Sequence, residues 1–341
     1  MALGPSTMEG IKSDDVSSVY TFDASGSLVG AITGPAIYAN SVSSLGDKLA
    51  STSSKQLTLT TPSGQSEFAI GFENIVQAST SDKRAGTATY WYNSGMVSGI
   101  YTNSYASISS QGELFGGTVN GLTRTVAQCG DLAYSIIQDI ATGVGEESTR
   151  SGLYRADSNG IRLTAAWDYP ADFKPISRTA ACGPNGEAIY ALYADNATLN
   201  SQNGMPGLTL ARVDTSTGSR TDTPLGMAGL DWSVVSGTMS VLDGRAYWIN
   251  AAKEVLSVDL SDAAGIVRRE WSLPGVEGNA VASVDNGKVD VVVPGRNARY
   301  SQHDLRTGAT IGTPIALPWL DALTDASPVS GQTLVDVASL E

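Results

Sequence analysis

The chain repeats one hairpin pattern seven times. In each copy an alternating strand leads into a polar turn that closes on a glycine, and a second alternating strand follows. The closing glycines are Gly26, Gly64, Gly112, Gly160, Gly218, Gly265 and Gly308. They are spaced by 38, 48, 48, 58, 47 and 43 residues. Spacing of this kind indicates a chain built from seven similar β-units.

A repeat of this length without helical segments between the copies is typical of a β-propeller. Weaker hairpins lie between the strong ones, and a weak and a strong hairpin together predict a four-stranded antiparallel blade. With 41% hydrophobic and 16% charged residues among 341, the chain fits one large all-β body. Six complete blades are expected at 37–70, 72–119, 122–167, 176–225, 230–273 and 278–317. A pair of β-sandwiches and a six-bladed ring are the alternatives.

The two ends of the chain are expected to share the seventh blade. Residues 17–32 supply only an outer hairpin, and residues 327–338 supply only an inner one. Pairing the two would close the ring without leaving a free edge strand. Residues 1–16 are then a flexible N-terminal segment and residues 339–341 a tail.

The strong hairpins resemble the repeat of the YVTN and quinoprotein-like propellers, in forms such as LARVDTSTG (210–218), LSVDLSDAAG (256–265) and SQHDLRTG (301–308). In those families an apolar strand, an Asp and a turn ending in Gly precede the outermost strand. The resemblance covers nearly the whole chain and implies the fold alone, so no catalytic residue is carried over from it. The preference for Arg over Lys is similar to that of secreted or lipid-anchored proteins of high-GC bacteria.

The net charge is −13, from 34 acidic and 21 basic residues. Phosphate binding needs a basic surface, so we do not expect nucleic acid as a partner. No apolar run reaches the roughly 18 residues that a membrane-spanning helix requires, and none is predicted. The first residues, MALGPSTMEGIKSDD, lack the apolar core of an intact signal peptide but are compatible with a trimmed mature end.

The two cysteines occupy corresponding places at the ends of the first strands of neighbouring blades. Cys129 lies in VAQCGDLAY and Cys182 in TAACGPNGEAIY. A disulfide between them would clamp two blades and would fit an oxidising compartment. Two buried thiols are the alternative, because equivalent positions in adjacent blades do not always face each other.

Ligands of propellers usually gather on the face formed by the links between blades. Here these links carry many aromatic side chains, which predict a docking surface for a protein or a glycan. The candidate residues are Tyr38, Phe72, Trp167, Tyr169, Phe173, Trp232 and Trp319. The alternative is that these rings fill the gaps between blades. On the same face, Arg124 and Arg178 could clamp a carboxylate or phosphate group.

Other candidate chemistry is sparse. The single histidine, His303, is expected to be a surface residue of an outer hairpin. Glu73, Asp231, Glu277 and Asp325 could meet at the pore mouth as a general acid and base, or could be solvated loop residues. The segments 193–204 and 259–265 carry oxygen atoms that could bind Ca²⁺, but they lack the EF-hand spacing, and no cofactor is predicted.

The residues therefore favour a binding role over catalysis. The leading hypothesis is an exported bacterial envelope propeller that binds a protein or a glycan, either secreted or lipid-anchored through a removed N-terminal segment. One alternative is a pore-mouth hydrolase or lyase that acts on a carbohydrate or a small anionic substrate. The other is an intracellular interaction hub.

Overall fold

The structure is a computed structural model of the whole chain. It describes residues 1–5, 16–35, 42–61, 63–140, 147–168, 173–195, 207–227, 229–235, 237–273, 280–324 and 332–339.

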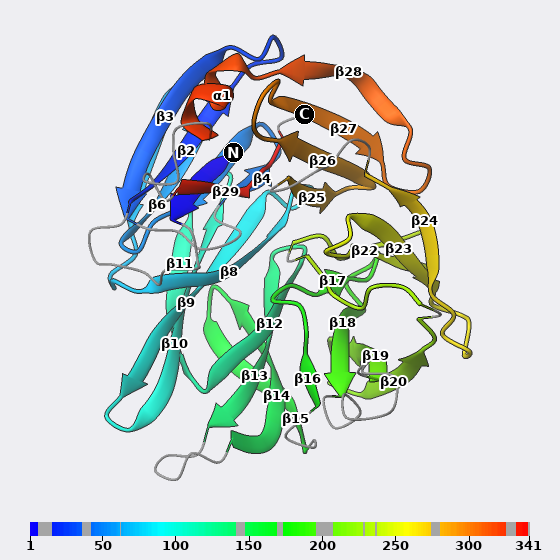
Figure 1. The fold of residues 1–341 in the computed structure, drawn as a ribbon. Coiled ribbons are helices and arrows are strands. Elements are labelled where there is room, and N and C mark those ends of the chain that lie inside the picture. Colours follow the sequence, from blue (N-terminus) through cyan, green and yellow to red (C-terminus); the bar gives the residue numbers. More distant parts are fainter. Residues whose placement is uncertain are drawn as a thin grey trace.

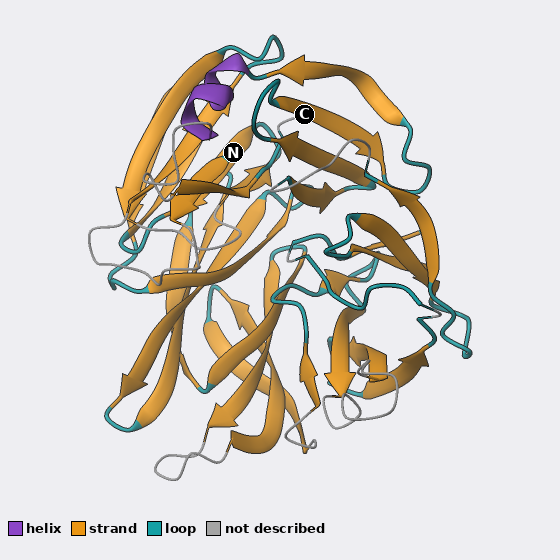
Figure 2. Ribbon diagram, in the orientation of Figure 1, coloured by secondary structure: helices purple, strands orange, loops and turns teal. Residues whose placement is uncertain are grey.

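Seven antiparallel sheets stand around a common centre and form a seven-bladed β-propeller, which confirms the predicted fold class (Figure 1). Strands make up nearly all of the regular structure (Figure 2). The chain passes outward through each blade, and each innermost strand faces the centre of the ring. In blade 4 the inner strand is divided into two short pieces, which both pair with the same second strand.

The strands of blade 1 are β4 (Val42–Leu45), β5 (Lys48–Thr52), β6 (Gln56–Thr61) and β7 (Gly64–Ala69). Those of blade 2 are β8 (Ile75–Asp82), β9 (Thr87–Val97), β10 (Ile100–Ser109) and β11 (Leu114–Asn120). Those of blade 3 are β12 (Leu122–Cys129), β13 (Leu132–Ile140), β14 (Glu147–Asp157) and β15 (Gly160–Asp168).

The strands of blade 4 are β16 (Phe173–Pro175), β17 (Ala181–Cys182), β18 (Ala188–Asp195), β19 (Gly207–Asp214) and β20 (Arg220–Leu225). Those of blade 5 are β21 (Ser240–Leu242), β22 (Arg245–Ile249), β23 (Glu254–Asp259) and β24 (Arg268–Ser272). Those of blade 6 are β25 (Val281–Asp285), β26 (Lys288–Val293), β27 (Arg299–Asp304) and β28 (Thr310–Ala316).

The seventh, closing blade joins the two ends of the chain, but its strands are divided differently from the expected hairpin pair. Its order is β29 (Gln332–Asp336), β1 (Ala2–Pro5), β2 (Val16–Phe22) and β3 (Leu28–Pro35). The C-terminal part thus gives one strand and the N-terminal part gives three. The expectation that the first residues are flexible is wrong for residues 1–5, where Met1 and Leu3 are both 1% exposed. A strand of four residues is too short to show an alternating pattern in the sequence.

The Asp and the Gly of the repeated outer hairpins have separate tasks. Asp214 accepts hydrogen bonds from two backbone N–H groups of the turn that follows it, and Asp304 does the same. These bonds fold the turn. Gly308 has a φ of 71°, and a Cβ at this position would lie 2.6 Å from the ring of Trp271 in the preceding blade. The glycine therefore allows the close approach of two blades.

Tryptophan side chains fasten successive blades to each other at these turns. In three places an indole N–H donates a hydrogen bond to a carbonyl oxygen in the outer turn of the next blade. The pairs are Trp167 with Gly218 at 3.0 Å, Trp271 with Leu305 at 2.8 Å, and Trp319 with Gly26 at 2.8 Å. The repeat is therefore also a unit of inter-blade contact.

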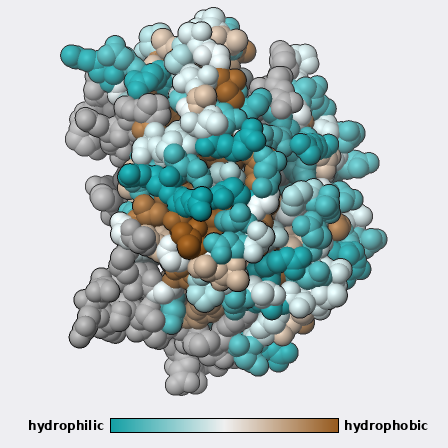
Figure 3. All heavy atoms as spheres, turned by 90° about the vertical axis from the view of Figure 1, so that its right-hand side faces the viewer, coloured by the Kyte–Doolittle hydropathy of each residue, from teal (hydrophilic) through white to brown (hydrophobic). Residues whose placement is uncertain are grey.

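The hydrophobic core lies between blades. Tyr90, Trp91 and Tyr92 follow one another on β9 and are all 0% exposed. Tyr90 and Tyr92 pack with side chains of blade 1, whereas Trp91 packs with side chains of blade 3. A strand buried on both faces needs consecutive apolar residues, which explains this run. The outer surface is mostly hydrophilic in the view of Figure 3, with small apolar areas between polar ones.

A short helix between blade 6 and the closing blade departs from the expected all-strand repeat. Helix α1 (Pro318–Thr324) starts with proline, which suits the first position of a helix. Its Asp321 accepts hydrogen bonds from the backbone N–H groups of Asn297 and Ala298 in blade 6. In the described part of the chain no helix is long and apolar enough to cross a membrane.

Candidate functional site

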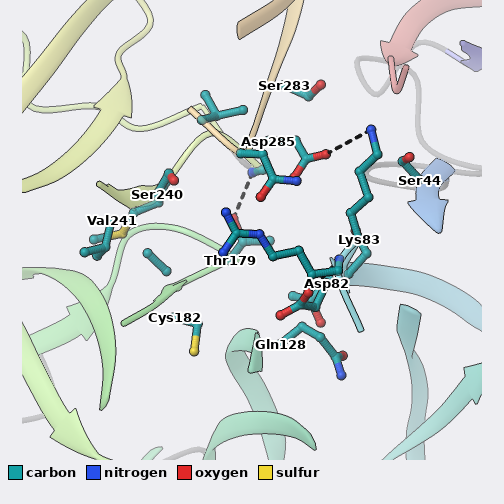
Figure 4. Close-up of a pocket in the computed structure, with 18 of the residues that line it drawn as sticks. Ser44, Asp82, Lys83, Gln128, Thr179, Cys182, Ser240, Val241, Ser283 and Asp285 are labelled. Carbon is teal, nitrogen blue, oxygen red and sulfur yellow. Dashed lines mark hydrogen bonds and ion pairs between the residues drawn. The ribbon is translucent and has the colours of Figure 1, made fainter. Parts of the chain in front are cut away.

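A cavity of about 800 Å³ lies at the centre of the ring, where the inner strands end (Figure 4). Its walls are the ends of the inner strands and the turns that lead to the second strands, and all seven blades contribute residues. Its volume is within the range of roughly 300–1,000 Å³ that is usual for ligand sites. The sequence analysis placed the candidate site at the other end of the inner strands, so this cavity was not predicted.

An ion pair crosses the cavity. Lys83 of blade 2 and Asp285 of blade 6 approach to 3.9 Å, although blade 1 and the closing blade lie between their blades (Figure 4). The Lys83 side chain is only 7% exposed. The Asp285 side chain is 40% exposed, so water screens the attraction between the two charges.

Asp82 is fixed at the edge of the same cavity. One carboxylate oxygen accepts hydrogen bonds from the backbone N–H groups of Arg84 and Ala85, each at 3.0 Å. The other oxygen accepts one from the backbone N–H of Gly130 in blade 3, also at 3.0 Å. These bonds set the orientation of the carboxylate and tie blade 2 to blade 3.

Two hydroxyl groups of residues in the wall have no hydrogen-bond partner among the described residues. The side-chain oxygens of Ser44 and Thr80 are buried and have no hydrogen-bond partner among the described residues. Both residues line the cavity, from the inner strands of blades 1 and 2. Thr179, by contrast, accepts a hydrogen bond from the backbone N–H of Gly237 at 2.8 Å. Buried polar groups without a partner are rare in proteins.

The predicted disulfide forms part of the cavity wall. Cys129 and Cys182 are bonded, with their Cα atoms 5.5 Å apart. Sheets that pack face to face are usually about 10 Å apart, but here the two inner strands approach closely enough for backbone hydrogen bonds. Val126 N–H donates to the Arg178 carbonyl at 3.0 Å, and Ala180 N–H donates to the Val126 carbonyl at 2.7 Å. This local parallel pairing brings the two cysteines together.

A second cavity of about 540 Å³ adjoins the first and shares Lys83 and Asp285 with it. Its buried carboxylate is Asp290, which accepts hydrogen bonds from Tyr300 at 2.6 Å, Gln302 at 3.0 Å and Ser339 at 2.8 Å. Burial, and then the negative charge of Asp290, raise the pKa of Tyr300 far above its usual value. This network holds the residues after β29 against blade 6.

The structure places four of the seven predicted docking aromatics in contacts inside the protein. The rings of Phe72 and Tyr92 are 4.9 Å apart, and those of Phe173 and Tyr193 are 5.0 Å apart and stacked. Trp167 and Trp319 make the inter-blade hydrogen bonds described above. Their positions agree with the alternative that such rings fill gaps between blades.

The other three aromatics give less information. Trp232 is half-buried on the face of the inter-blade links. Tyr38 and Tyr169 lie outside the described residues. A docking surface on this face therefore stays a prediction.

The two predicted arginines do lie near each other. Arg178 donates a hydrogen bond to the Thr123 carbonyl at 3.4 Å, and Arg124 is the next residue along β12. Partial burial lowers the pKa of Arg178, and the positive charge of Arg124 lowers it further.

The candidate catalytic acids that the structure describes are separate surface residues. Glu73 forms an exposed ion pair with Lys55 at 3.1 Å. Asp231 is exposed and accepts a hydrogen bond from the backbone N–H of Ser233. Neither residue lines the central cavity, while Glu277 and Asp325 lie outside the described residues.

The two candidate calcium segments give no metal site that can be described. In 259–265, Asp259 and Asp262 accept hydrogen bonds from backbone N–H groups of their own turn. Most of 193–204 lies outside the described residues. A calcium site therefore stays untested.

The expectation that His303 is a surface residue is wrong. The side chain is 2% exposed, with Nε2 3.0 Å from the Ser301 hydroxyl and Nδ1 3.2 Å from the Gly308 carbonyl. Its ring lies 5.7 Å from that of Trp271. The outer turn is covered by the preceding blade, which the sequence of one hairpin does not reveal.

Comparisons with known proteins show the fold alone. No protein-family model and no curated protein matches the chain. Sqt1 of Saccharomyces cerevisiae is similar with a TM-score of 0.51 and 14% identity, over 88% of this chain and 80% of that one. The acylaminoacyl peptidase of Pyrococcus horikoshii has a TM-score of 0.51 and 12% identity, over 94% of this chain and 50% of that one. This chain thus spans half the length of the peptidase.

A third structure with a similar fold is apo AztD of Citrobacter koseri. Its TM-score is 0.45 at 12% identity, over 89% of this chain and 80% of that one. Propellers serve many functions, so the fold alone does not indicate what this protein does.

Proposed function

We propose that the protein is a non-enzymatic binding module that works outside the cytoplasm and takes a segment of a protein partner into its central cavity. The observation that carries the proposal is the cavity itself, to which all seven blades contribute and whose wall includes two hydroxyl groups without a partner among the described residues. Because every blade contributes to this site, the site exists only when the ring is closed.

The chemistry of the wall favours a polypeptide over a sugar. Apolar side chains such as Val241 and Met239 line the same cavity as the charged pair of Lys83 and Asp285. A peptide can match such a mixture with apolar side chains, charged groups and backbone amides. None of the described residues that line the cavity is aromatic, so a sugar ring would find no flat surface to stack on.

The carboxylates of the wall have structural duties, which supports binding over catalysis. Asp82 accepts three backbone hydrogen bonds, and Asp290 accepts three side-chain hydrogen bonds. Asp285 pairs with Lys83, and Asp243 pairs with Arg306. A general acid or base has to exchange its proton with a substrate, and groups held in this way are poorly placed to do so.

Site-specific photo-cross-linking in the native cells tests where a partner binds. A photoreactive amino acid replaces Ser240 or Ser283 in the cavity wall, and the matched control replaces Gln65 on the outermost strand of blade 1. We expect a discrete cross-linked protein from both cavity positions and none from Gln65. The same reagent at Trp232 examines the face of the inter-blade links. Cross-linking at Trp232 with none at the cavity positions would overturn the proposed site.

Work outside the cytoplasm is supported by the disulfide, because such bonds persist in oxidising compartments. The test is the mass of the protein isolated from its native cells and alkylated under denaturing conditions, with and without a reductant. We expect Cys129 and Cys182 to react only after reduction. Alkylation of both thiols without reductant would contradict this part of the proposal and favour an intracellular protein.

A further inference from the structure

A group of hydrogen-bond donors surrounds Thr123 at the start of β12. Its backbone N–H donates to the side-chain oxygen of Asn103 at 3.2 Å, and its carbonyl accepts from Arg178 at 3.4 Å. The next residue is Arg124, where a bulge interrupts the register of β12, and its Nε donates to Gln138 at 2.5 Å. The side chains of Asn103 and Arg178 therefore both contact the backbone of Thr123, and Arg124 is the next residue.

On β12 this group lies at the opposite end of the strand from the central cavity, whereas Arg178 directly precedes Thr179 of the cavity wall. Arg124 is five residues before Cys129, which lines the cavity, and a strand of that length spans roughly 16 Å. Arg124 and Arg178 line neither of the two cavities described above. The group is therefore separate from the proposed partner site.

The backbone around the two arginines is rigid. Val126 donates to the Arg178 carbonyl and accepts from Ala180, so the segment around Arg178 is held against β12 on both sides. The disulfide fastens the same two segments a few residues further along. Preorganised donors of this kind lose little entropy when a ligand binds.

The charge of Arg178 is not neutralised within the described part of the protein. Among the described residues no carboxylate lies within ion-pair distance of its guanidinium, and its hydrogen bond goes to a neutral carbonyl. Partial burial and the nearby charge of Arg124 both act against its protonated form and lower its pKa. Carboxylates are plentiful in a chain of net charge −13, yet none of the described ones pairs with Arg178. A bound anion would offset both the burial and the repulsion.

Two other donors at this place have no hydrogen-bond partner among the described residues. The side-chain nitrogen of Asn103 is buried and makes no hydrogen bond to a described residue, and the same holds for the hydroxyl of Thr123. Asn103 is 0% exposed and Thr123 is 1% exposed. A buried amide N–H₂ without an acceptor is costly, and its presence beside two arginines indicates that an acceptor belongs at this point.

We propose that Arg124 and Arg178, with Asn103 and Thr123, form a binding site for a carboxylate group. The guanidinium of arginine is a planar fork that matches the two oxygens of a carboxylate. A chain terminus, an acidic side chain and a small organic acid all present this group. The site does not depend on the central cavity, so it can fail or succeed independently of the proposed function.

Isothermal titration calorimetry at constant ionic strength tests the site, with acetate, citrate and inorganic phosphate as the probes. We expect one saturable binding event for a carboxylate probe. Arg178→Gln should weaken it at least tenfold, and Arg178→Lys, which keeps the charge but loses the fork, should weaken it less. Arg296→Gln is the matched control, because it removes one exposed positive charge in the turn between β26 and β27. It should change the affinity by less than twofold.

Three results would overturn the proposal. The first is the absence of saturable binding for all three probes. The second is an equal loss in Arg178→Gln and Arg296→Gln, which would show a general effect of net charge. The third is binding of phosphate at least tenfold tighter than that of both carboxylates, which would assign the site to phosphate groups. A melting curve of each variant shows whether it is folded. If Arg178→Gln does not fold, the comparison of Arg178→Lys with the wild type still tests the site.

Discussion

The indole nitrogen of Trp319 donates a hydrogen bond to the carbonyl oxygen of Gly26 at 2.8 Å and joins residues 293 positions apart. Trp319 lies on α1, after the sixth blade, and Gly26 lies in the outer turn of the closing blade. The rings of Tyr20 and Phe22 lie 5.5 and 6.0 Å from the Trp319 ring. The last inter-blade contact of the ring is therefore of the same kind as those of Trp167 and Trp271 inside the chain.

Replacing Trp319 by phenylalanine isolates the hydrogen bond. Trp319→Phe keeps most of the apolar ring and loses the N–H donor, so we expect the free energy of unfolding in urea to fall by about 1 kcal/mol. The matched control is Trp232→Phe, because the Trp232 indole donates to no residue in the described ranges. Equal losses in the two variants would show that the bond to Gly26 contributes nothing to stability.

The close approach at Gly308 predicts a larger effect of a single methyl group. In Gly308→Ala the new Cβ would lie 2.6 Å from the Trp271 ring, and the backbone φ of 71° is unfavourable for alanine. Gly244→Ala is the control, since its φ is 74° and no atom lies within 4 Å of the new Cβ. We expect Gly308→Ala to lower the free energy of unfolding by about 1–3 kcal/mol more than Gly244→Ala does. Similar values would mean that only the backbone conformation matters.

The repeat predicted the number of blades and the positions of most strands, because strand alternation and turn glycines are local signals. The disulfide was also predicted, since equivalent positions of Cys129 and Cys182 in adjacent blades are visible in the sequence. Arg124 and Arg178 also occupy equivalent positions in adjacent blades, and the structure places them near each other. Residues at equivalent positions of neighbouring repeats therefore lie close together in the folded ring.

The features that the sequence did not predict depend on contacts between distant segments. The ion pair of Lys83 and Asp285 joins blades that are not neighbours, so no repeat position indicates it. The only visible signal is that the turns SDKRAG (81–86) and VDNG (284–287) are charged. The sequence predicted an exposed His303, but the ring of Trp271, 32 residues earlier in the chain, covers it. A contact between two blades of this kind has no local signal in the sequence.

The turn of Asp214 predicts a specific dependence of stability on pH. Hydrogen bonds from the side chain of Ser216 and from Thr217 lower the pKa of the Asp214 carboxyl far below its usual value. A group with a lowered folded-state pKa stabilises the protein above its unfolded-state pKa of about 3.9, and this contribution disappears as the pH falls through the folded-state pKa.

Asp214→Asn should therefore be less stable than the wild type at pH 7, and the difference should shrink progressively below about pH 4. Urea unfolding at a series of pH values measures this difference. Asp47→Asn is the control, because the Asp47 carboxylate accepts no hydrogen bond from a described residue. A difference between Asp214→Asn and wild type that is the same at pH 7 and at pH 2 would contradict the argument.

The division of the closing blade into one and three strands gives the last prediction. β1 lies between β29 and β2, and Leu3 is 1% exposed in a cluster with Val292 and Leu317. Leu3→Ala should therefore lower the free energy of unfolding by about 3 kcal/mol, as expected for a buried leucine. Leu28→Ala is the matched control in the same blade, because Leu28 is 44% exposed at the start of β3. It should cost less than about 1 kcal/mol. If the first residues were a flexible segment outside the blade, Leu3→Ala would leave stability unchanged, so the comparison decides between the two ways of closing the ring.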